Sequence, residues 1–263
     1  MGRLAGKAAV VIGAGNRGNM AQVIAERLRN EGAQVVAAGR KMEELERFAA
    51  QIGGHAIACD ITSRDQVFAL ARDAKARMGH ISIAVQATGW GFVKPFPETT
   101  ETELDQMMAL QFKGPFMFCQ AMVDAMTDGG SIIQISSATA KIMLENHAAY
   151  MGTKAGIDHV IRCVANEFGG QGIRANSISP GLTDTPMNAE AKQVPGLFDS
   201  FIGGYPLGRI GTSEDVAAAA VFLASDECFM TGENLQVNGG LTLRKNPSAA
   251  EIEAAIAKAM GAG

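Results

Sequence analysis

A serine, a tyrosine and a lysine are spaced so that together they could act on a carbonyl oxygen. Ser137 ends a strand-like segment, and Tyr150 and Lys154 lie four positions apart in a helix-like one. Residues at positions i and i+4 share one face of a helix, so the lysine ammonium can favour the tyrosine phenolate. A tyrosine with a lowered pKa exchanges protons near neutral pH, while a serine hydroxyl holds the same oxygen. This spacing predicts acid–base chemistry on a carbonyl or an alcohol.

A glycine-rich turn near the N-terminus has the composition of a phosphate-binding turn. The stretch Gly13-Ala-Gly-Asn-Arg-Gly18 joins the first strand-like segment to the first helix-like one. Glycines there let the backbone approach a pyrophosphate, whose charge the helix N-terminus stabilises. The turn therefore predicts a dinucleotide cofactor.

The end of the second strand-like segment bears on the choice of cofactor. NAD enzymes place an acidic residue there to bind the ribose hydroxyls, whereas a 2′-phosphate requires cations. Here Arg40 and Lys41 follow the strand, no acidic residue comes before Glu43, and Arg17 adds a third positive group. A guanidinium can form two bonds to phosphate oxygens. The pattern favours NADP(H) over NAD(H).

Strand-like and helix-like segments alternate along the whole chain. The expected strands cover residues 8–12, 35–38, 55–59, 81–87, 131–136, 174–178 and 235–237. The expected helices cover residues 20–30, 43–51, 64–78, 103–126, 148–168, 212–225 and 248–260. This alternation predicts an α/β fold, with a doubly wound parallel sheet of about seven strands and helices on both faces.

Two long loops, at residues 90–102 and 180–210, follow strand ends and are the expected substrate walls. Trp90 is expected to supply an apolar part of such a wall. His147 either lines the pocket with its neighbours Glu145 and Asn146 or is a solvated loop residue. The C-terminal helix at 248–260 could cover its own substrate site, cover a neighbour's, or lie on the surface without a role.

Over residues 6–243 the chain resembles the short-chain dehydrogenase/reductase family. The matching stretches are residues 13–18, 59–61, 86–89, Ser137, Tyr150 with Lys154, 180–186 and 237–240. The resemblance implies an NAD(P)-dependent oxidoreductase on a single Rossmann domain, residues 1–263. It also implies that Tyr150 is the general acid/base and that Ser137 orients the substrate oxygen. Lys154 would lower the tyrosine pKa and bind the nicotinamide ribose.

The same resemblance implies the cofactor contacts. In the glycine turn they are Gly13, Asn19 and Met20, because Asn19-Met-Ala21 replaces the family's Gly-x-Gly ending, as in bacterial enoyl-acyl-carrier reductases. The other contacts, from the adenine to the nicotinamide end, are Asp60, Ile61, Thr88, Gly89, Tyr150, Lys154, Gly181, Leu182, Thr183 and Thr185.

Gln111 departs from the family pattern. The family's fourth catalytic group is an asparagine in an Asn-x-x-Gly motif, and this chain has Gln111-Phe-Lys-Gly114. Glutamine keeps the amide but adds a methylene, so a catalytic role for Gln111 in holding a relay water stays open. The family's Asn-Asn-Ala-Gly stretch also reads Gln86-Ala-Thr-Gly89 here.

Two alternative functions remain beside the carbonyl or alcohol reaction. Enoyl-thioester reductases separate their tyrosine and lysine by six residues, whereas three separate Tyr150 from Lys154, so a carbonyl or alcohol substrate is favoured. The second alternative is a catalytically weak NADP-binding sensor or scaffold.

Composition narrows the class of protein. The 263 residues are 47% hydrophobic with a net charge of −4, which lacks the basic character of a nucleic-acid binder. No apolar run is long enough to cross a membrane, and the four cysteines form no C-x-x-C pair or metal spacing. We expect a cytoplasmic protein without a metal, acting on a small molecule. The resemblance implies a homotetramer or homodimer.

Overall fold

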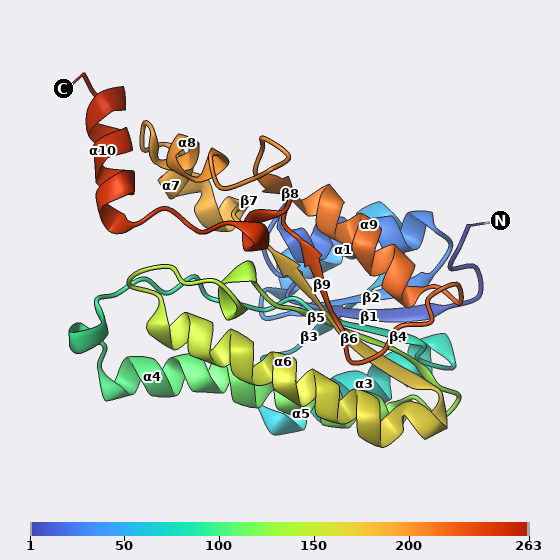
Figure 1. The fold of residues 1–263 in the computed structure, drawn as a ribbon. Coiled ribbons are helices and arrows are strands. Elements are labelled where there is room, and N and C mark those ends of the chain that lie inside the picture. The colour runs from blue at the N-terminus through green and yellow to red at the C-terminus, as the bar shows by residue number, and fades with distance from the viewer. Residues whose placement is uncertain (1, 262–263) are drawn as a thin grey trace.

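Seven parallel strands form the central sheet of the computed structural model, which describes residues 2–261 (Figure 1). The strands are β1 (Ala8–Ile12), β2 (Gln34–Gly39), β3 (His55–Ala58), β4 (Ile83–Gln86), β5 (Gly130–Ile135), β6 (Ile173–Pro180) and β9 (Asn234–Val237). Their order across the sheet is β3-β2-β1-β4-β5-β6-β9. The predicted doubly wound parallel sheet is confirmed, with its switch point between β1 and β4.

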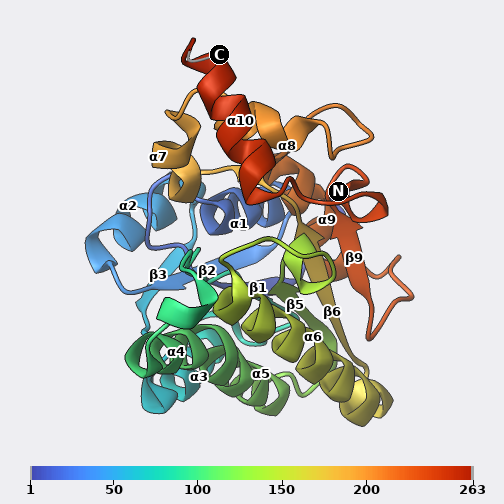
Figure 2. The ribbon, with the colours of Figure 1, turned by 60° about the vertical axis from the view of Figure 1, so that its left-hand side comes forward.

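Helices cover both faces of this sheet (Figure 2). On one face lie α1 (Met20–Asn30), α2 (Met42–Ile52) and α9 (Ser213–Ala224). On the other face lie α3 (Arg64–Met78), α5 (Gly114–Ala125) and α6 (Ala148–Phe168), with α4 (Glu101–Met108) preceding α5. None of the helices in the described part of the chain is long and apolar enough to cross a membrane.

The central strand β1 explains why its sequence is apolar without alternation. Ala8, Val10 and Ile12 pack into the core beneath α3, α5 and α6. Ala9 and Val11 pack into the opposite core, beneath α1 and α9. Since side chains of a strand alternate between faces, a strand covered on both sides needs apolar residues at every position.

The helix expected at residues 103–126 is wrong as one continuous α-helix. Between α4 and α5 the chain forms a π-helical turn, Ala109–Lys113, in which the Gly114 amide bonds the Ala109 carbonyl. Pro115 follows and has no N–H to donate to the carbonyl four residues earlier, so regular α-helical bonding fails there. Sequence periodicity alone does not reveal a π-helical turn. This turn contains Gln111.

The segment at 180–210 is also more ordered than the loop expected there. It holds the short strand β7 (Thr183–Asp184), which pairs with β8 (Gly211–Thr212), and the helices α7 (Ala189–Lys192) and α8 (Leu197–Ile202). The predicted C-terminal helix is α10 (Ala249–Ala259), and it packs against α8 (Figure 1).

Gly196 fixes the approach of α8 to α10. Its φ is +75°, and a Cβ atom there would lie 2.4 Å from the Ala255 carbonyl oxygen of α10. We expect Gly196→Ala to cost about 1–3 kcal/mol through backbone strain and this clash, and to speed amide hydrogen exchange in α10. The matched control is Gly203→Ala, because a Cβ at Gly203 meets no atom within 4 Å. Equal exchange in both variants would contradict the packing described.

Candidate active site

Tyr150 and Lys154 lie on the first turns of α6, which begins at Ala148. The Lys154 Nζ atom is 5.7 Å from the centre of the Tyr150 ring and donates to the Ile135 carbonyl at the end of β5, at 2.9 Å. Lys154 is 4% exposed, whereas Tyr150 is half-buried. The i, i+4 spacing has therefore brought phenol and ammonium together at the carboxyl end of the central sheet.

Ser137 stands two residues beyond β5 and caps a short 3₁₀ turn, Ala138–Ala140. Its Oγ atom lies 2.8 Å from the Thr139 hydroxyl and accepts from the Thr139 amide at 3.2 Å. Ser137, Tyr150 and Lys154 line one cavity of about 150 Å³. The structure thus unites the three residues that sequence spacing singled out.

Burial shifts the pKa values of both Tyr150 and Lys154. It raises the pKa of Tyr150, and interaction with the Ser137 hydroxyl offsets part of that rise. Burial lowers the pKa of Lys154 to about 8, against the opposing pull of the Asp158 carboxylate. In the protein alone the tyrosine pKa is therefore raised, and the lowering by Lys154 stays a prediction for the cofactor-loaded enzyme.

Asp158 lies behind Lys154 and was missed by the sequence reasoning. Its Oδ2 atom accepts from the Ser136 hydroxyl at 2.8 Å and from the Asn234 amide at 2.6 Å, while burial raises the pKa of this carboxyl. These bonds tie α6 to the end of β5 and to β9. The signal was present, because Asp158 follows Lys154 by four positions on the same helix.

Gln111 is 2% exposed, and its amide is used within the protein. The Oε1 atom accepts from the Trp90 amide at 3.0 Å, and Nε2 donates to the Thr153 hydroxyl at 3.2 Å. Thr153 in turn donates to the Tyr150 carbonyl at 2.8 Å. The side chain therefore braces the segment after β4 against α6, which makes Gln111 a positioning residue, and its catalytic role stays a prediction.

The glycine turn forms a cradle in front of α1. Gly13 has φ +110°, and a Cβ atom there would lie 2.8 Å from the Ala87 carbonyl, so the turn requires glycine at this point. Asn19 caps α1 by accepting from the Gln22 amide at 3.0 Å, and its own amide donates to the Gly13 carbonyl at 2.8 Å. Such a tight backbone before a helix N-terminus fits a pyrophosphate.

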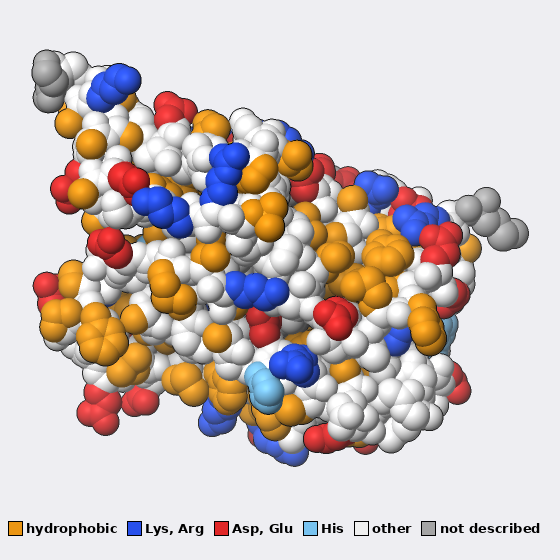
Figure 3. Space-filling model, in the orientation of Figure 1, with side chains coloured by type: hydrophobic (Ala, Val, Ile, Leu, Met, Phe, Trp, Pro, Cys, Tyr) orange, Lys and Arg blue, Asp and Glu red, His pale blue; other side chains and the backbone are white. Residues whose placement is uncertain are grey.

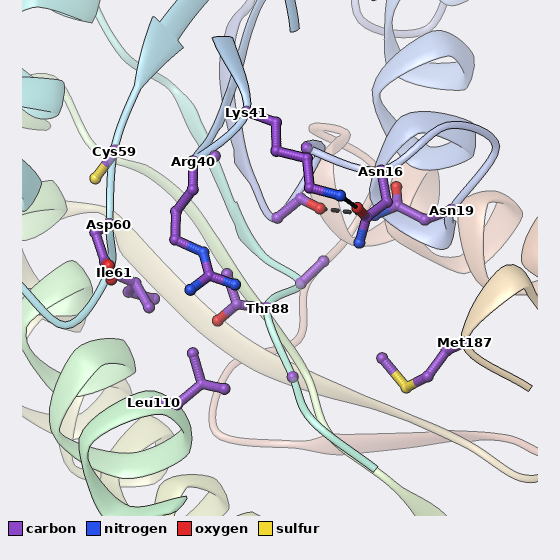
Figure 4. Close-up of a pocket in the computed structure, with 15 residues that line it drawn as sticks. Asn16, Asn19, Arg40, Lys41, Cys59, Asp60, Ile61, Thr88, Leu110 and Met187 are labelled. Atoms are coloured by element: carbon purple, nitrogen blue, oxygen red, sulfur yellow. Dashed lines mark hydrogen bonds between the residues drawn. The ribbon is translucent and has the colours of Figure 1, made fainter. Parts of the chain in front are cut away.

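A cavity of about 140 Å³ extends from this cradle (Figure 4). The residues predicted to bind the cofactor that line it are Gly13, Asn19, Arg40, Lys41, Asp60, Ile61, Thr88 and Gly89. The Arg40 side chain extends into it between Asp60 and Thr88, while Lys41 turns aside to donate to the Asn16 side chain at 2.7 Å.

Two further cavities are lined by predicted cofactor residues, and Thr88 and Gly89 are shared with the first cavity. Met20, Thr88, Gly89, Gly181, Thr183 and Thr185 line the cavity that holds Tyr150 and Lys154. Leu182 instead lines the adjoining larger cavity. Arg17 lines neither, and lies close enough to Glu44 to contribute to the lowered pKa of that carboxyl, which Arg47 lowers most. The structure therefore brings Arg40 and Lys41 to the cavity beside the glycine turn and leaves Arg17 outside it.

A larger cavity, of about 390 Å³, opens beside Ser137 and Tyr150. Both loops expected as substrate walls line this cavity. His147 lines it too, together with Glu145 and Asn146, which agrees with the interpretation of His147 as a pocket residue. Ala249 and Ile252 of α10 complete it, so the C-terminal helix covers the site of its own chain. Trp90 instead lines the cavity that holds Ser137, Tyr150 and Lys154, and its ring centre is 4.8 Å from that of Phe92.

A doubly wound sheet, a glycine cradle and a joined Ser–Tyr–Lys cavity define an oxidoreductase of the dinucleotide-binding class. Comparison with known proteins agrees. Residues 13–242 match the family model described as enoyl-(acyl carrier protein) reductase. The chain belongs to the short-chain dehydrogenase/reductase family, and its relatives include enzymes named as dehydrogenases of alcohols.

Three relatives illustrate the similarity. D-threitol dehydrogenase of Mycolicibacterium smegmatis is 35% identical over 250 residues, covering 92% of this chain and 95% of that one. NAD-dependent glycerol dehydrogenase of Listeria innocua is 34% identical over 246 residues, covering 90% and 94%. The solved structure of a short-chain type dehydrogenase/reductase from Mycobacterium ulcerans matches with a TM-score of 0.89 at 28% identity, covering 96% and 98%.

The position of Asp158 predicts a change in pH dependence. The Asp158 carboxylate raises the pKa of Lys154, so Asp158→Asn lowers it further, and Lys154 loses its proton at a lower pH. If catalysis needs the ammonium, the alkaline limb of kcat/KM moves to lower pH, and activity near pH 8 falls roughly threefold or more. The exposed Asp73→Asn on α3 is the control. A pH profile that does not move would contradict this coupling.

Proposed function

We propose that the protein is an NADP(H)-dependent oxidoreductase that interconverts a ketone or aldehyde and the corresponding alcohol. The single observation that carries this proposal is the shared cavity. Ser137, Tyr150 and Lys154 line it together with Thr183 and Thr185 of the predicted nicotinamide end. A reacting carbon placed there would meet both the nicotinamide and the phenol.

The chain's own residues perform the proton chemistry in this proposal. When bound, the cofactor supplies a hydride in reduction and accepts one in oxidation. In reduction the Tyr150 hydroxyl gives its proton to the carbonyl oxygen as the carbon is reduced, and the Ser137 hydroxyl donates to the same oxygen. The Lys154 ammonium, held by the Ile135 carbonyl, stabilises the phenolate that remains. Oxidation runs through the same groups in reverse.

The proposed preference for NADP(H) rests on the end of β2. Arg40 extends into the cofactor cavity, and no carboxylate stands between Gly39 and Glu43 to bind ribose hydroxyls. The guanidinium can instead donate two hydrogen bonds to the oxygens of a 2′-phosphate. One relative, the glycerol dehydrogenase, is NAD-dependent. The proposed preference for NADP(H) therefore depends on the residues at the end of β2 and not on the relatives.

The description of the matching family model favours a second candidate, reduction of an enoyl thioester. The spacing of Tyr150 and Lys154 argues against it, because enoyl reductases have six residues between this tyrosine and lysine and this chain has three. The catalytically weak sensor or scaffold stays the third candidate.

We also propose a cytoplasmic homodimer or homotetramer. Phe116 on α5 is 42% exposed, beside a groove between α5 and α6 of about 350 Å³ that is lined largely by apolar side chains. Light scattering on a sizing column tests the assembly, since a monomeric mass would exclude it.

The test of the proposed function is oxidation of NADPH and NADH with a set of ketones, aldehydes and enoyl thioesters. We expect turnover of carbonyl compounds with NADPH as the better cofactor. Turnover of enoyl thioesters alone would establish the second candidate, and cofactor binding without any turnover would favour the third.

A further inference from the structure

We propose that the substrate is a bulky carbonyl compound, or its alcohol, with an apolar carbon frame and a single polar group at the reacting carbon. This inference rests on the proposed function and narrows it. It differs from what the names of the threitol and glycerol dehydrogenases would suggest, because those substrates carry a hydroxyl on every carbon.

The first support is the wall of the larger cavity. Beyond Ser137 and Tyr150 it is formed mainly by aliphatic and aromatic side chains from four separate segments. These include Leu144, Leu182, Leu197, Phe201, Leu241 and Ile252. Transfer of an apolar surface from water into such a wall is favourable, whereas a polyol gains nothing from it.

The second support is that three polar side chains on this wall already have partners within the protein. His147 Nδ1 is 2.6 Å from the Glu145 carbonyl oxygen, so this bond uses one of its two ring nitrogens. The amide of Asn188 donates to the Thr183 carbonyl at 2.9 Å, and that of Asn246 donates to the Met143 carbonyl at 3.0 Å. These bonds leave fewer donors for a row of hydroxyls, and buried hydroxyls without partners weaken binding.

The small number of charged side chains on this wall also favours an uncharged, apolar substrate. His147 and Glu145 are the titratable side chains on the wall besides Tyr150. Burial lowers the pKa of His147, so the imidazole is neutral at neutral pH, and Glu145 is exposed. The deep part of the cavity therefore offers neither an ion pair for a charged substrate nor a cation for a phosphate group.

The third support is the closure of the cavity by α10. Ile252 faces it, and the helix start is held by the Ser248–Glu251 capping box and by Lys245, which donates to Glu251 at 2.8 Å. At the open side lie Val93 and Met187, which are 60% and 63% exposed. In Figure 3 the surface is indented between α10 and α4. An apolar mouth that leads to an apolar end suits a frame of two fused rings.

The experiment compares two ketones with NADPH in the full-length protein. The first is 2-decalone, a bicyclic hydrocarbon ketone, and the second is erythrulose, a four-carbon hydroxyketone. We expect kcat/KM at least about 100-fold higher for decalone, since each well-placed methylene contributes roughly 10-fold or more. Ile252→Ser should lower kcat/KM for decalone at least about 10-fold, mostly through KM, with the Kd for NADPH unchanged.

Met260→Ser is the matched control, because Met260 closes the same helix but is 68% exposed and lies off the cavity. It should leave both substrates and the Kd unaffected. Preferred reduction of erythrulose, or an Ile252→Ser effect equal to that of Met260→Ser, would overturn the inference while leaving the proposed function intact. If neither ketone is reduced although NADPH binds, the inference falls, and the wider set of carbonyl compounds decides the proposed function.

Discussion

Replacing Tyr150 by phenylalanine is expected to lower kcat/KM by roughly 100- to 10,000-fold, the range that a positioned general acid or base contributes. The change removes only the hydroxyl that would give its proton to the substrate oxygen. The ring still packs beside Lys154, whose Nζ lies 5.7 Å from its centre. The measurement is the rate of NADPH oxidation with a ketone that the unchanged protein reduces.

The interpretation of this variant depends on intact cofactor binding. Since Lys154 keeps its bond to the Ile135 carbonyl, the Kd for NADPH should change less than about threefold, a small step on the scale where tenfold is 1.4 kcal/mol. A fluorescence titration measures it in parallel. Turnover as fast as in the unchanged protein would exclude Tyr150 as the proton donor, whatever the cofactor affinity.

Replacing Arg40 by serine is expected to weaken NADPH binding roughly 10- to 100-fold, because hydrogen bonds to charged groups contribute about 1.5–3 kcal/mol. NADH, which lacks the 2′-phosphate, should bind with nearly unchanged affinity. Arg40 is suited to this test since its side chain extends into the cofactor cavity, whereas Lys41 is engaged with Asn16.

The control for Arg40→Ser is Arg72→Ser, which removes the same charge from the exposed side of α3. It corrects for any change in net charge, and both titrations are run at one ionic strength because the contact is electrostatic. If Arg40→Ser weakens NADPH and NADH equally, or weakens neither, the basic turn does not select the 2′-phosphate. The proposed cofactor preference would then be wrong.

Most of the fold was predictable because the strands and helices carry strong local patterns. Strand β1 is apolar at every position, which indicates a strand covered on both faces, and both cores are found. The bounds of α1, α3 and α6 match the predicted ranges; Asn19 caps the start of α1, and Gly79 follows the end of α3. The spacing of Tyr150 and Lys154 likewise predicted their approach.

The parts that sequence did not predict depend on contacts between distant segments. The network of Asp158 needs Ser136 from the end of β5 and Asn234 from β9, which come together only in the folded sheet. The brace formed by Gln111 depends on a π-helical turn that has no periodic signature. Arg17 was grouped with Arg40 by type and by its place in the glycine turn, but it lines neither cavity and lies near Glu44.

The central claim, hydride exchange between NADP(H) and a carbonyl carbon with Tyr150 as proton donor, can be measured directly. The protein is incubated with a ketone that the unchanged protein reduces and with NADPH that carries deuterium at the transferable position of its nicotinamide, and the product is examined by mass spectrometry. We predict one deuterium on the carbinol carbon with the unchanged protein, and transfer slowed at least about 100-fold in Tyr150→Phe. Deuterated NADPH that binds but gives no labelled alcohol, or equal labelling by both proteins, would contradict this account.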